Sequence, residues 1–395
     1  MTHRLGVLGL LCLIAGCSSA PVKETAAEPT EQAAVRADAP FERINPLWVL
    51  PLRSTARYDL PPFERTKPIL LGDSDILYVA DQQGRVLAVH RRKGFILWET
   101  KMPSGVSGAF AYGRSKLVVG DRQGNLIALN ARDGSEAWRF KIQGEWLSPP
   151  AFSANQVLAV SSAGDLYAFH ESSGKETWHY ARHSDQKMSI LGIGGPSVYG
   201  STDVFQGFGD GTLVALSVEK GRILWEKSLR GRERFYDIEM SPYVDEKRVI
   251  AATYDGRVES LNRLTGETLW VFPVGSYGGF LVEGDRLYFA GVNHQFYCVD
   301  LGSGQPVWTT AYEGGIASAP ILVRGKLVFA TSGDPSYVVD PQNGKILDRV
   351  PLGAGTLASA VGTSKDGAFY LLSNYGNLFA FEIIVKAMAG VVAGL

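Results

Sequence analysis

The chain has 395 residues and a formal net charge of −1, so it carries no basic field that would attract nucleic acid. Its composition, 45% hydrophobic and 20% charged, is that of an ordinary globular protein. The 45 glycines and eight tryptophans favour many turns and short strands over long helices. We therefore expect an all-β fold and no nucleic-acid partner.

Residues 1–16 have the pattern of a secretory signal peptide. His3 and Arg4 precede an apolar run, residues 5–14, that is too short to span a membrane. The run ends in LIAGC, residues 13–17, which resembles the bacterial lipobox. That resemblance implies cleavage before Cys17 and lipid attachment to its sulfur and its new amine, which would anchor the protein to the periplasmic face of the outer membrane. A secreted protein with an unmodified cysteine is the alternative.

Residues 17–44 are rich in alanine, glutamate, proline and threonine and contain few large apolar side chains. Such a segment cannot bury enough surface to offset chain entropy, so we expect a flexible tether, with a short docked helix as the alternative. Once Cys12 leaves with the signal and Cys17 carries lipid, only Cys298 remains. The mature chain therefore forms no intramolecular disulfide, and we expect Cys298 in the core of a strand.

From residue 84 onward, a pattern of two tight turns repeats eight times. The first turn position falls at residues 84, 124, 164, 211, 256, 294, 334 and 376, so the spacings are 40, 40, 47, 45, 38, 40 and 42 residues. Glycine occupies it except at His294 and Asp334, which are residue types that tolerate a positive φ angle better than most. In the first seven repeats another glycine follows ten residues later, as Gly134 follows Gly124.

Alternating apolar residues before, between and after these turns predict four strands in each repeat. Eight such units of about forty residues predict an eight-bladed β-propeller with four antiparallel strands per blade, covering residues 45–383. The eighth repeat lacks its fourth strand, whereas the segment around Trp48 precedes the first repeat. We therefore predict that the N-terminal strand completes the last blade. Residues 384–395 depart from the repeat and form an apolar C-terminal tail, too short to span a bilayer.

Six tryptophans occupy one position of the pattern, four residues after the second glycine, and Trp48 is the corresponding residue of the N-terminal strand. Such regular placement favours packing between neighbouring blades over the stacking of a ligand. Asp348 takes the tryptophan position in the seventh repeat, and Trp146 lies outside the pattern. The expected blade-docking residues are Trp48, Trp98, Trp138, Trp178, Trp225, Trp270 and Trp308.

The repeated unit, Asp-x-x-Gly followed by Gly-x-x-x-Trp, resembles the tryptophan-docking repeat of quinoprotein dehydrogenases. Those enzymes are usually longer and often have adjacent cysteines and a calcium ion beside the quinone, whereas this chain has no vicinal cysteine pair. His179 and His183 lie four residues apart in strand and loop, where this spacing does not form a metal site. We expect no enzyme activity, cofactor or metal. A quinone-dependent periplasmic dehydrogenase or a quinone-sensing propeller is the alternative.

The chain combines a lipobox, a tether and eight such blades, and in this combination it resembles the BamB family. Members of that family are lipoprotein accessories of the machinery that inserts β-barrels into the bacterial outer membrane. The resemblance implies a noncatalytic scaffold that binds the periplasmic POTRA region of BamA, the barrel-inserting subunit, within the assembly complex. Unfolded outer-membrane proteins are further candidate partners.

The two longest repeats should place their extra residues in loops on one face, where binding commonly occurs. MSILG, residues 188–192, resembles the family's Leu-Ser-Leu-Arg-Gly loop, and DIEMSP, residues 237–242, resembles its Asp-Val-Asp-Thr-Thr-Pro segment. The resemblance implies that the partner-binding residues are Met188, Ile190, Leu191, Asp237 and Glu239.

Leu191 replaces the family arginine and so removes a bidentate ionic contact at that position. Positive charge nearby is available from Lys187, Arg230, Arg232 or Arg234. The alternative interpretation places Ile190 and Leu191 in the core of a strand.

Overall fold

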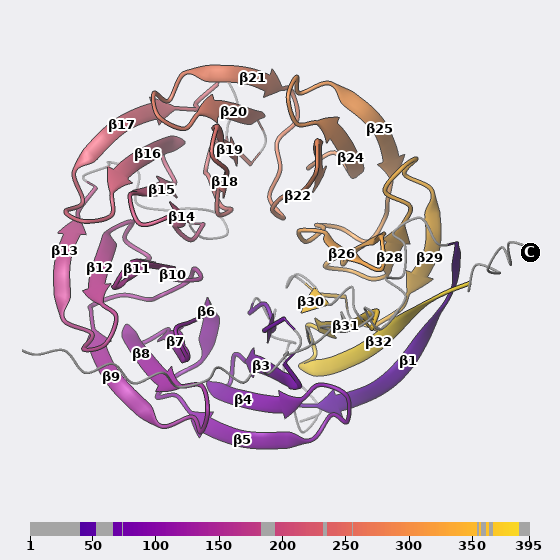
Figure 1. The fold of residues 1–395 in the computed structure, drawn as a ribbon, viewed down its shortest axis with the longest axis horizontal. Helices are drawn as coiled ribbons and strands as arrows, with labels where there is room; N and C mark the ends of the chain where they lie inside the picture. The colour runs from indigo at the N-terminus through magenta and orange to yellow at the C-terminus, as the bar shows by residue number, and fades with distance from the viewer. Residues whose placement is uncertain are drawn as a thin grey trace, which may run out of the picture. The chain divides into compact units, whose positions relative to one another are not determined.

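The computed structural model describes residues 40–52, 66–72, 74–182, 194–231, 235–254, 256–353, 355–356, 361–362 and 366–386. All of them belong to one compact unit, Val35–Leu395. Their regular structure is entirely β and comprises eight four-stranded antiparallel sheets. These sheets surround a central axis as eight blades (Figure 1). The predicted eight-bladed propeller is confirmed.

Within each blade the first strand lies nearest the axis and the fourth lies outermost (Figure 1). Blades 1 to 4, in chain order, consist of the following strands: β2 (Ile69–Leu70), β3 (Ile76–Ala80), β4 (Arg85–His90) and β5 (Ile96–Lys101); β6 (Val106–Gly113), β7 (Lys116–Asp121), β8 (Asn125–Asn130) and β9 (Glu136–Lys141); β10 (Ala151–Ser153), β11 (Gln156–Val160), β12 (Leu166–His170) and β13 (Glu176–Tyr180); β14 (Ser197–Tyr199), β15 (Asp203–Gly207), β16 (Thr212–Ser217) and β17 (Ile223–Ser228).

Blades 5 to 8 follow the same order. Their strands are β18 (Tyr243–Val244), β19 (Arg248–Ala252), β20 (Val258–Asn262) and β21 (Thr268–Phe272); β22 (Leu281–Glu283), β23 (Arg286–Ala290), β24 (Gln295–Asp300) and β25 (Pro306–Ala311); β26 (Ile321–Val323), β27 (Lys326–Phe329), β28 (Ser336–Val339) and β29 (Ile346–Val350); β30 (Val361–Gly362), β31 (Ala368–Leu372), β32 (Asn377–Val385) and β1 (Phe41–Pro51).

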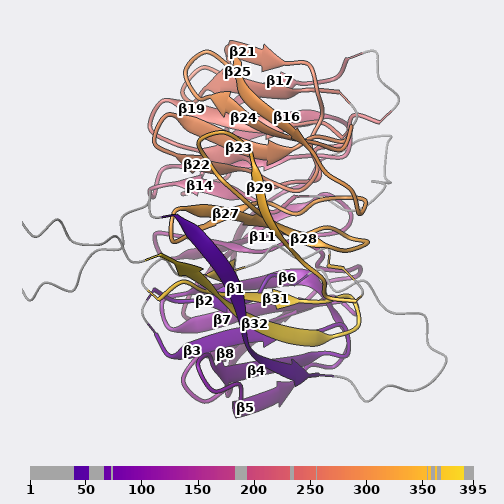
Figure 2. The ribbon, with the colours of Figure 1, turned by 90° about the vertical axis from the view of Figure 1, so that its right-hand side faces the viewer.

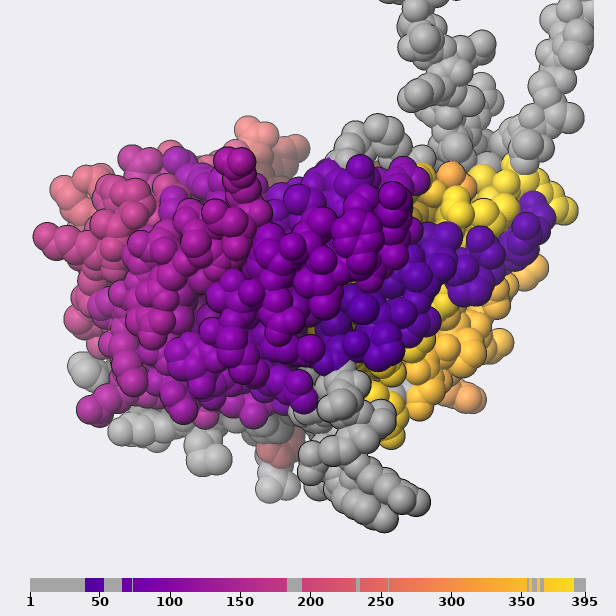
Figure 3. Space-filling view, turned by 90° about the horizontal axis from the view of Figure 1, so that it is seen from below, coloured from indigo at the N-terminus to yellow at the C-terminus, as the bar shows by residue number. Residues whose placement is uncertain are grey.

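The ring closes within blade 8, where β1 pairs antiparallel with β32. Figure 3 shows the indigo N-terminal strand on the outer wall, between the yellow C-terminal residues and the purple first blade. The predicted closure by the N-terminal strand is therefore confirmed. The pairing runs from Phe41 opposite Val385 to Pro51 opposite Asn377. Both strands thus pass the expected limits at residues 45 and 383, because each supplies the hydrogen-bonding partner that extends the other.

Loops lie on two opposite faces of the ring. The connection face, as we call it, carries the connections between consecutive blades, such as residues 102–105, and the turns between second and third strands. The turn face carries the turns between first and second strands and between third and fourth strands. Because β1 begins and β32 ends beside those turns, both ends of the described propeller lie on the turn face (Figure 2).

The hydrophobic core is divided among the blade interfaces. Eight buried apolar clusters each combine side chains from two neighbouring blades. One of them, for example, joins Val86 of blade 1 to Val119 of blade 2, and another joins Leu77 of blade 1 to Tyr370 of blade 8. Each sheet buries both of its faces in this way, which explains why the second and third strands are apolar along most of their length.

The seven repeated tryptophans lie at these interfaces. Each indole N–H donates a hydrogen bond to a backbone carbonyl in the turn between the third and fourth strands of the next blade. The donor–acceptor pairs are Trp48 to Arg91 (2.9 Å), Trp98 to Ala131 (3.2 Å), Trp138 to Glu171 (2.8 Å), Trp178 to Val218 (2.8 Å), Trp225 to Arg263 (2.8 Å), Trp270 to Leu301 (3.1 Å) and Trp308 to Pro341 (2.9 Å).

The second glycine of each repeat receives the tryptophan ring. A Cβ atom at Gly174, for instance, would lie 2.5 Å from Cε3 of Trp138, and Gly174 also has a φ of +68°. A larger residue would therefore clash with the indole and strain the turn. The first turn position needs a positive φ as well: His294 and Asp334 have φ angles of 59° and 80°, as their residue types predict.

Two residues outside the tryptophan pattern are also buried. Trp146 is 0% exposed and its indole N–H donates to the carbonyl oxygen of Gly124 at 2.9 Å. Cys298 is 0% exposed in β24, as expected, and burial raises the pKa of its thiol to about 11. Among the residues that the structure describes, no helix is long and apolar enough to cross a membrane.

Candidate functional site

The two longest repeats place their extra residues in consecutive connections, between blades 3 and 4 and between blades 4 and 5. Met188, Ile190 and Leu191, which belong to the first connection, lie outside the described residues, as does the lipid-attachment residue Cys17. Asp237 and Glu239 belong to the second connection and are described.

Arg182 holds the start of the first connection against blade 4. Its Nε donates to Oδ2 of Asp210 at 2.9 Å, and its Nη2 donates to Thr212 at 2.9 Å and Glu226 at 3.0 Å. The guanidinium also lies 5.0 Å from the ring centroid of Phe208. Burial disfavours its charge, but the two carboxylates outweigh burial and raise the pKa of Arg182.

The end of the first connection packs directly against the second. The N–H of Gly194 donates to the carbonyl oxygen of Ile238 at 3.4 Å, and the hydroxyl of Ser197 donates to that of Pro242 at 2.6 Å. The approach is so close that a Cβ atom at Gly194 would lie 2.2 Å from the carbonyl carbon of Met240. Residues 194–197 and 237–242 thus form a single surface element, which we call the paired connection.

The two predicted acidic residues differ in their exposure. Asp237 is only 3% exposed, and its carbonyl oxygen accepts the N–H of Tyr254 at 3.1 Å. Ile238 is fully buried, with its N–H donating to the carbonyl oxygen of Phe208 at 3.2 Å. Glu239 is half-buried. Glu239 is therefore the more exposed of the two acidic residues, although its Oε2 atom is buried.

One of the predicted basic residues lies beside the paired connection. The guanidinium of Arg230 stacks 4.2 Å from the ring centroid of Tyr236, and its Nη2 donates to the hydroxyl of that tyrosine at 2.8 Å. Lys187, Arg232 and Arg234 lie outside the described residues. Arg230 is exposed and thus places positive charge close to Glu239 in sequence and on the same face.

A row of aromatic rings, which the repeat pattern does not contain, continues from the paired connection toward blade 6. Phe235 meets Tyr254 edge to face at 6.3 Å, and Tyr254 meets Tyr277 in the same way at 6.2 Å. The only sequence signal for this row was the presence of aromatic residues outside the repeated positions. That signal could not predict the row, because the side chains come from separate connections and turns that only the closed propeller brings together.

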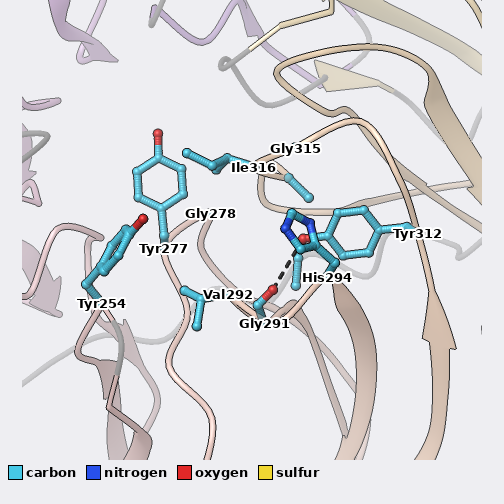
Figure 4. Close-up of a pocket in the computed structure, with 11 residues that line it drawn as sticks. Tyr254, Tyr277, Gly278, Gly291, Val292, His294, Tyr312, Gly315 and Ile316 are labelled. Carbon is cyan, nitrogen blue, oxygen red and sulfur yellow. Dashed lines mark hydrogen bonds between the residues drawn. The ribbon is translucent and has the colours of Figure 1, made fainter. Parts of the chain in front are cut away.

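The row leads to a pocket of about 110 Å³ on the connection face, between blades 5, 6 and 7 (Figure 4). Tyr277 and Ile316 stand on one side of it, and His294 lies edge-on against Tyr312, with 5.8 Å between ring centroids. Its lining consists of Tyr254, Tyr277, Gly278, Ala290, Gly291, Val292, His294, Tyr312, Gly315, Ile316 and Ala317.

The arrangement of titratable groups offers no metal centre within the described part of the chain, where no three His, Cys, Asp or Glu side chains come together. His179 instead lies 2.9 Å from Oε1 of Glu176 on the exposed side of β13, and His183 falls outside the described residues. The site offers backbone, aromatic and charged groups on one face as binding contacts.

Comparison with known proteins gives one family. A family model described as outer membrane protein assembly factor BamB matches residues 82–310. The outer membrane protein assembly factor BamB of Legionella pneumophila is 36% identical over 393 residues, which cover 96% of this chain and 98% of the relative. The crystal structure of BamB from Moraxella catarrhalis matches with a TM-score of 0.72 at 20% identity and covers 86% of this chain and 100% of that one.

The fold is also shared with enzymes. The quinohemoprotein alcohol dehydrogenase ADHIIG of Pseudomonas putida matches with a TM-score of 0.70 at 13% identity, over 87% of this chain and 77% of the enzyme. At that identity the likeness extends to the propeller fold alone.

Proposed function

Because this chain belongs to the BamB family of outer membrane protein assembly factors, we propose that it is a noncatalytic scaffold that binds the POTRA region of BamA within the assembly machinery. The observation that carries the proposal is the paired connection. The described ends of two consecutive connections, residues 194–197 and 237–242, pack into one surface that includes the half-buried Glu239 and has the exposed Arg230 beside it. Charged groups of both signs around an apolar, fixed backbone suit recognition of a folded partner.

Attachment through lipid at Cys17 is part of the same proposal. A lipidated Cys17, followed by the tether, would hold the propeller at the periplasmic face of the outer membrane. The described propeller starts on the turn face, opposite the connection face. This geometry supports a model in which the tether leaves the paired connection accessible to BamA.

Site-directed photocrosslinking in intact cells tests the interface. We expect a crosslinking amino acid at Ile190 or Glu239 to capture BamA. The matched control is Glu219, a carboxylate on the turn face whose side chain is 78% exposed, and it should give no BamA adduct. Failure at both test positions, or equal capture from Glu219, would exclude this interface.

The proposal of a noncatalytic protein rests on the assembly factors to which the chain is related. The dehydrogenase alternative is supported only by the shared propeller. Purified protein examined for a quinone absorption band and for calcium-dependent dye reduction distinguishes the two, and either signal would favour the enzyme.

A further inference from the structure

The pocket between blades 5, 6 and 7 is continuous with the paired connection. The backbone of Tyr254 is hydrogen-bonded to Asp237, and its ring contacts both Phe235 and Tyr277. Tyr254 and Tyr277 also line the pocket. A partner that lies along this aromatic row therefore meets the pocket where the row ends.

The wall of the pocket suits an uncharged group. Among the residues that the structure describes, none that lines it is Asp, Glu, Lys or Arg. Tyr312 donates its hydroxyl hydrogen to the carbonyl oxygen of Gly291 at 3.3 Å (Figure 4). Burial raises the pKa of this hydroxyl to about 12, so the phenol stays neutral at physiological pH. A charged side chain would lose hydration here and would meet no Asp, Glu, Lys or Arg side chain among the described lining residues.

The volume of the pocket favours some uncharged side chains over others. Its volume of about 110 Å³ is smaller than the roughly 150 Å³ of an engineered protein cavity that accommodates benzene. A branched aliphatic side chain fits this space better than an aromatic ring. Val292, which is 36% exposed, and Ile316 supply apolar contacts for such a side chain.

We propose that this pocket seats one branched aliphatic side chain, of leucine size, from an uncharged polypeptide segment that crosses the connection face. The inference rests on the proposed function in one respect, namely that the connection face binds polypeptides. The pocket would act as an anchor, since single buried side chains in fitted pockets dominate the energetics of many protein interfaces.

Titration of the full-length protein with short peptides tests this anchor directly. The probes are Gly-Ser-X-Ser-Gly peptides, blocked at both ends, with Leu, Phe, Ala or Lys at X, and the readout is the methyl NMR spectrum. We expect the Leu peptide to shift the methyl resonances of Ile316 and Val292 in a saturable manner, and the Ala and Lys peptides to leave them unchanged. The Phe peptide should bind more weakly than the Leu peptide.

Two matched variants control for the position of binding. Val292→Phe fills the pocket from its rim and should weaken binding of the Leu peptide about tenfold. Val307→Phe adds the same ring at a valine that is 45% exposed on the outer wall and should change nothing. Both variants should melt at the temperature of the parent.

Equal shifts from the Leu and Lys peptides, or full binding by Val292→Phe, would overturn the proposal. The experiment contains no BamA, so its failure is distinct from a failure of the proposed function. If the protein crosslinks to BamA but does not bind the Leu peptide, only the proposal of an anchoring pocket is refuted.

Discussion

A single tryptophan joins two blades through two different contacts. Trp138 packs its ring on Gly174, which no larger residue could replace without a clash, and donates its indole N–H to the carbonyl oxygen of Glu171. Apolar burial and a satisfied hydrogen bond therefore depend on the same side chain. The glycine and the tryptophan are both repeated because the tryptophan of one blade packs on the second glycine of the next.

Replacing Trp138, which is 6% exposed, by alanine removes both contacts. We expect the free energy of unfolding to fall by about 3 to 5 kcal/mol, as for other buried aromatic residues. Urea denaturation followed by circular dichroism measures the change. Leu224→Ala, at a side chain that is 51% exposed on the outer wall, is the control and should cost no more than about 0.5 kcal/mol. Equal losses in the two variants would contradict the docking role.

An ion pair joins blade 8 to blade 1 on the turn face. Nη1 of Arg91 lies 2.5 Å from Oδ2 of Asp366, and Nη2 of Arg92 lies 2.8 Å from the same oxygen. Burial, the largest single effect, would raise the pKa of the Asp366 carboxyl. The hydrogen bonds from Arg91 and the Ala368 N–H and the charges of Arg91 and Arg92 together outweigh burial and hold this pKa below its usual range. The side chain of Arg91 is 3% exposed, so loss of Asp366 would leave a buried charge whose other carboxylate contact, Asp75, lies 3.8 Å away and is itself 62% exposed.

This pair predicts how stability depends on pH. Because the folded pKa of Asp366 lies below the unfolded value of about 3.9, the stabilisation is complete above about pH 5 and is lost as the pH falls through the folded pKa. Asp366→Asn should cost about 3 kcal/mol at pH 7 and flatten the stability curve between about pH 5 and 3. Denaturation at a series of pH values measures both effects. A variant that keeps the parent's slope would refute this assignment, and Asp285→Asn, at a carboxylate that is 76% exposed, is the control.

At the scale of the strand, the construction of blade 8 explains why blade 7 has Asp348 where the other blades have a docking tryptophan. Asp348 pairs with Val338 in the position where Trp138 pairs with Ala128 in blade 2. In every other blade the incoming indole meets the turn between the third and fourth strands. Blade 8 has no such turn, because β32 and β1 come from opposite ends of the chain. An indole at residue 348 would therefore find neither the glycine nor the carbonyl oxygen that receives the others.

Restoring the consensus residue should consequently bring no benefit. We expect Asp348→Trp to change the free energy of unfolding by less than about 1 kcal/mol. The opposite exchange in blade 6, Trp308→Asp, should cost at least about 3 kcal/mol. Calorimetric melting of the two variants tests the explanation. A stabilisation by Asp348→Trp comparable to the loss in Trp308→Asp would show that blade 8 does offer a docking surface.

The strands could be predicted from sequence because each blade repeats the same physical solution. Alternating apolar residues mark the strands. The turn positions need positive φ angles, so even His294 and Asp334 could be assigned to turns. The paired connection could not be predicted in the same way. Asp237 and Ile238 are fixed by backbone hydrogen bonds to Tyr254 and Phe208 respectively, which lie in other turns of the ring. The pocket likewise requires residues from blades 5 and 6 and from the connections that follow them, and no local pattern encodes their meeting.

In the whole molecule, we expect stability and partner binding to depend on different regions. The blade interfaces hold the ring together, whereas the proposed binding residues lie on the connection face. Glu239→Gln should therefore leave the melting temperature unchanged while weakening binding to a purified POTRA fragment of BamA about fivefold. Binding should also become less sensitive to salt.

Calorimetric titration at two ionic strengths measures this effect, with Glu219→Gln on the turn face as the control. An unchanged affinity in Glu239→Gln, or a matching loss in the control, would remove Glu239 from the interface.

The closure of the ring has one more consequence. The N–H of Lys386 donates to the carbonyl oxygen of Pro40 at 2.9 Å, so the two ends of the described propeller are already neighbours. A short linker between them would give blade 8 the turn that it lacks, and the chain could then be opened at any equivalent turn to give a circular permutant. All of these turns lie on the turn face. In such permutants, the point from which an anchoring tether leaves the ring could thus move from blade to blade while the connection face stayed the same. The propeller fold itself does not determine at which blade the tether is attached.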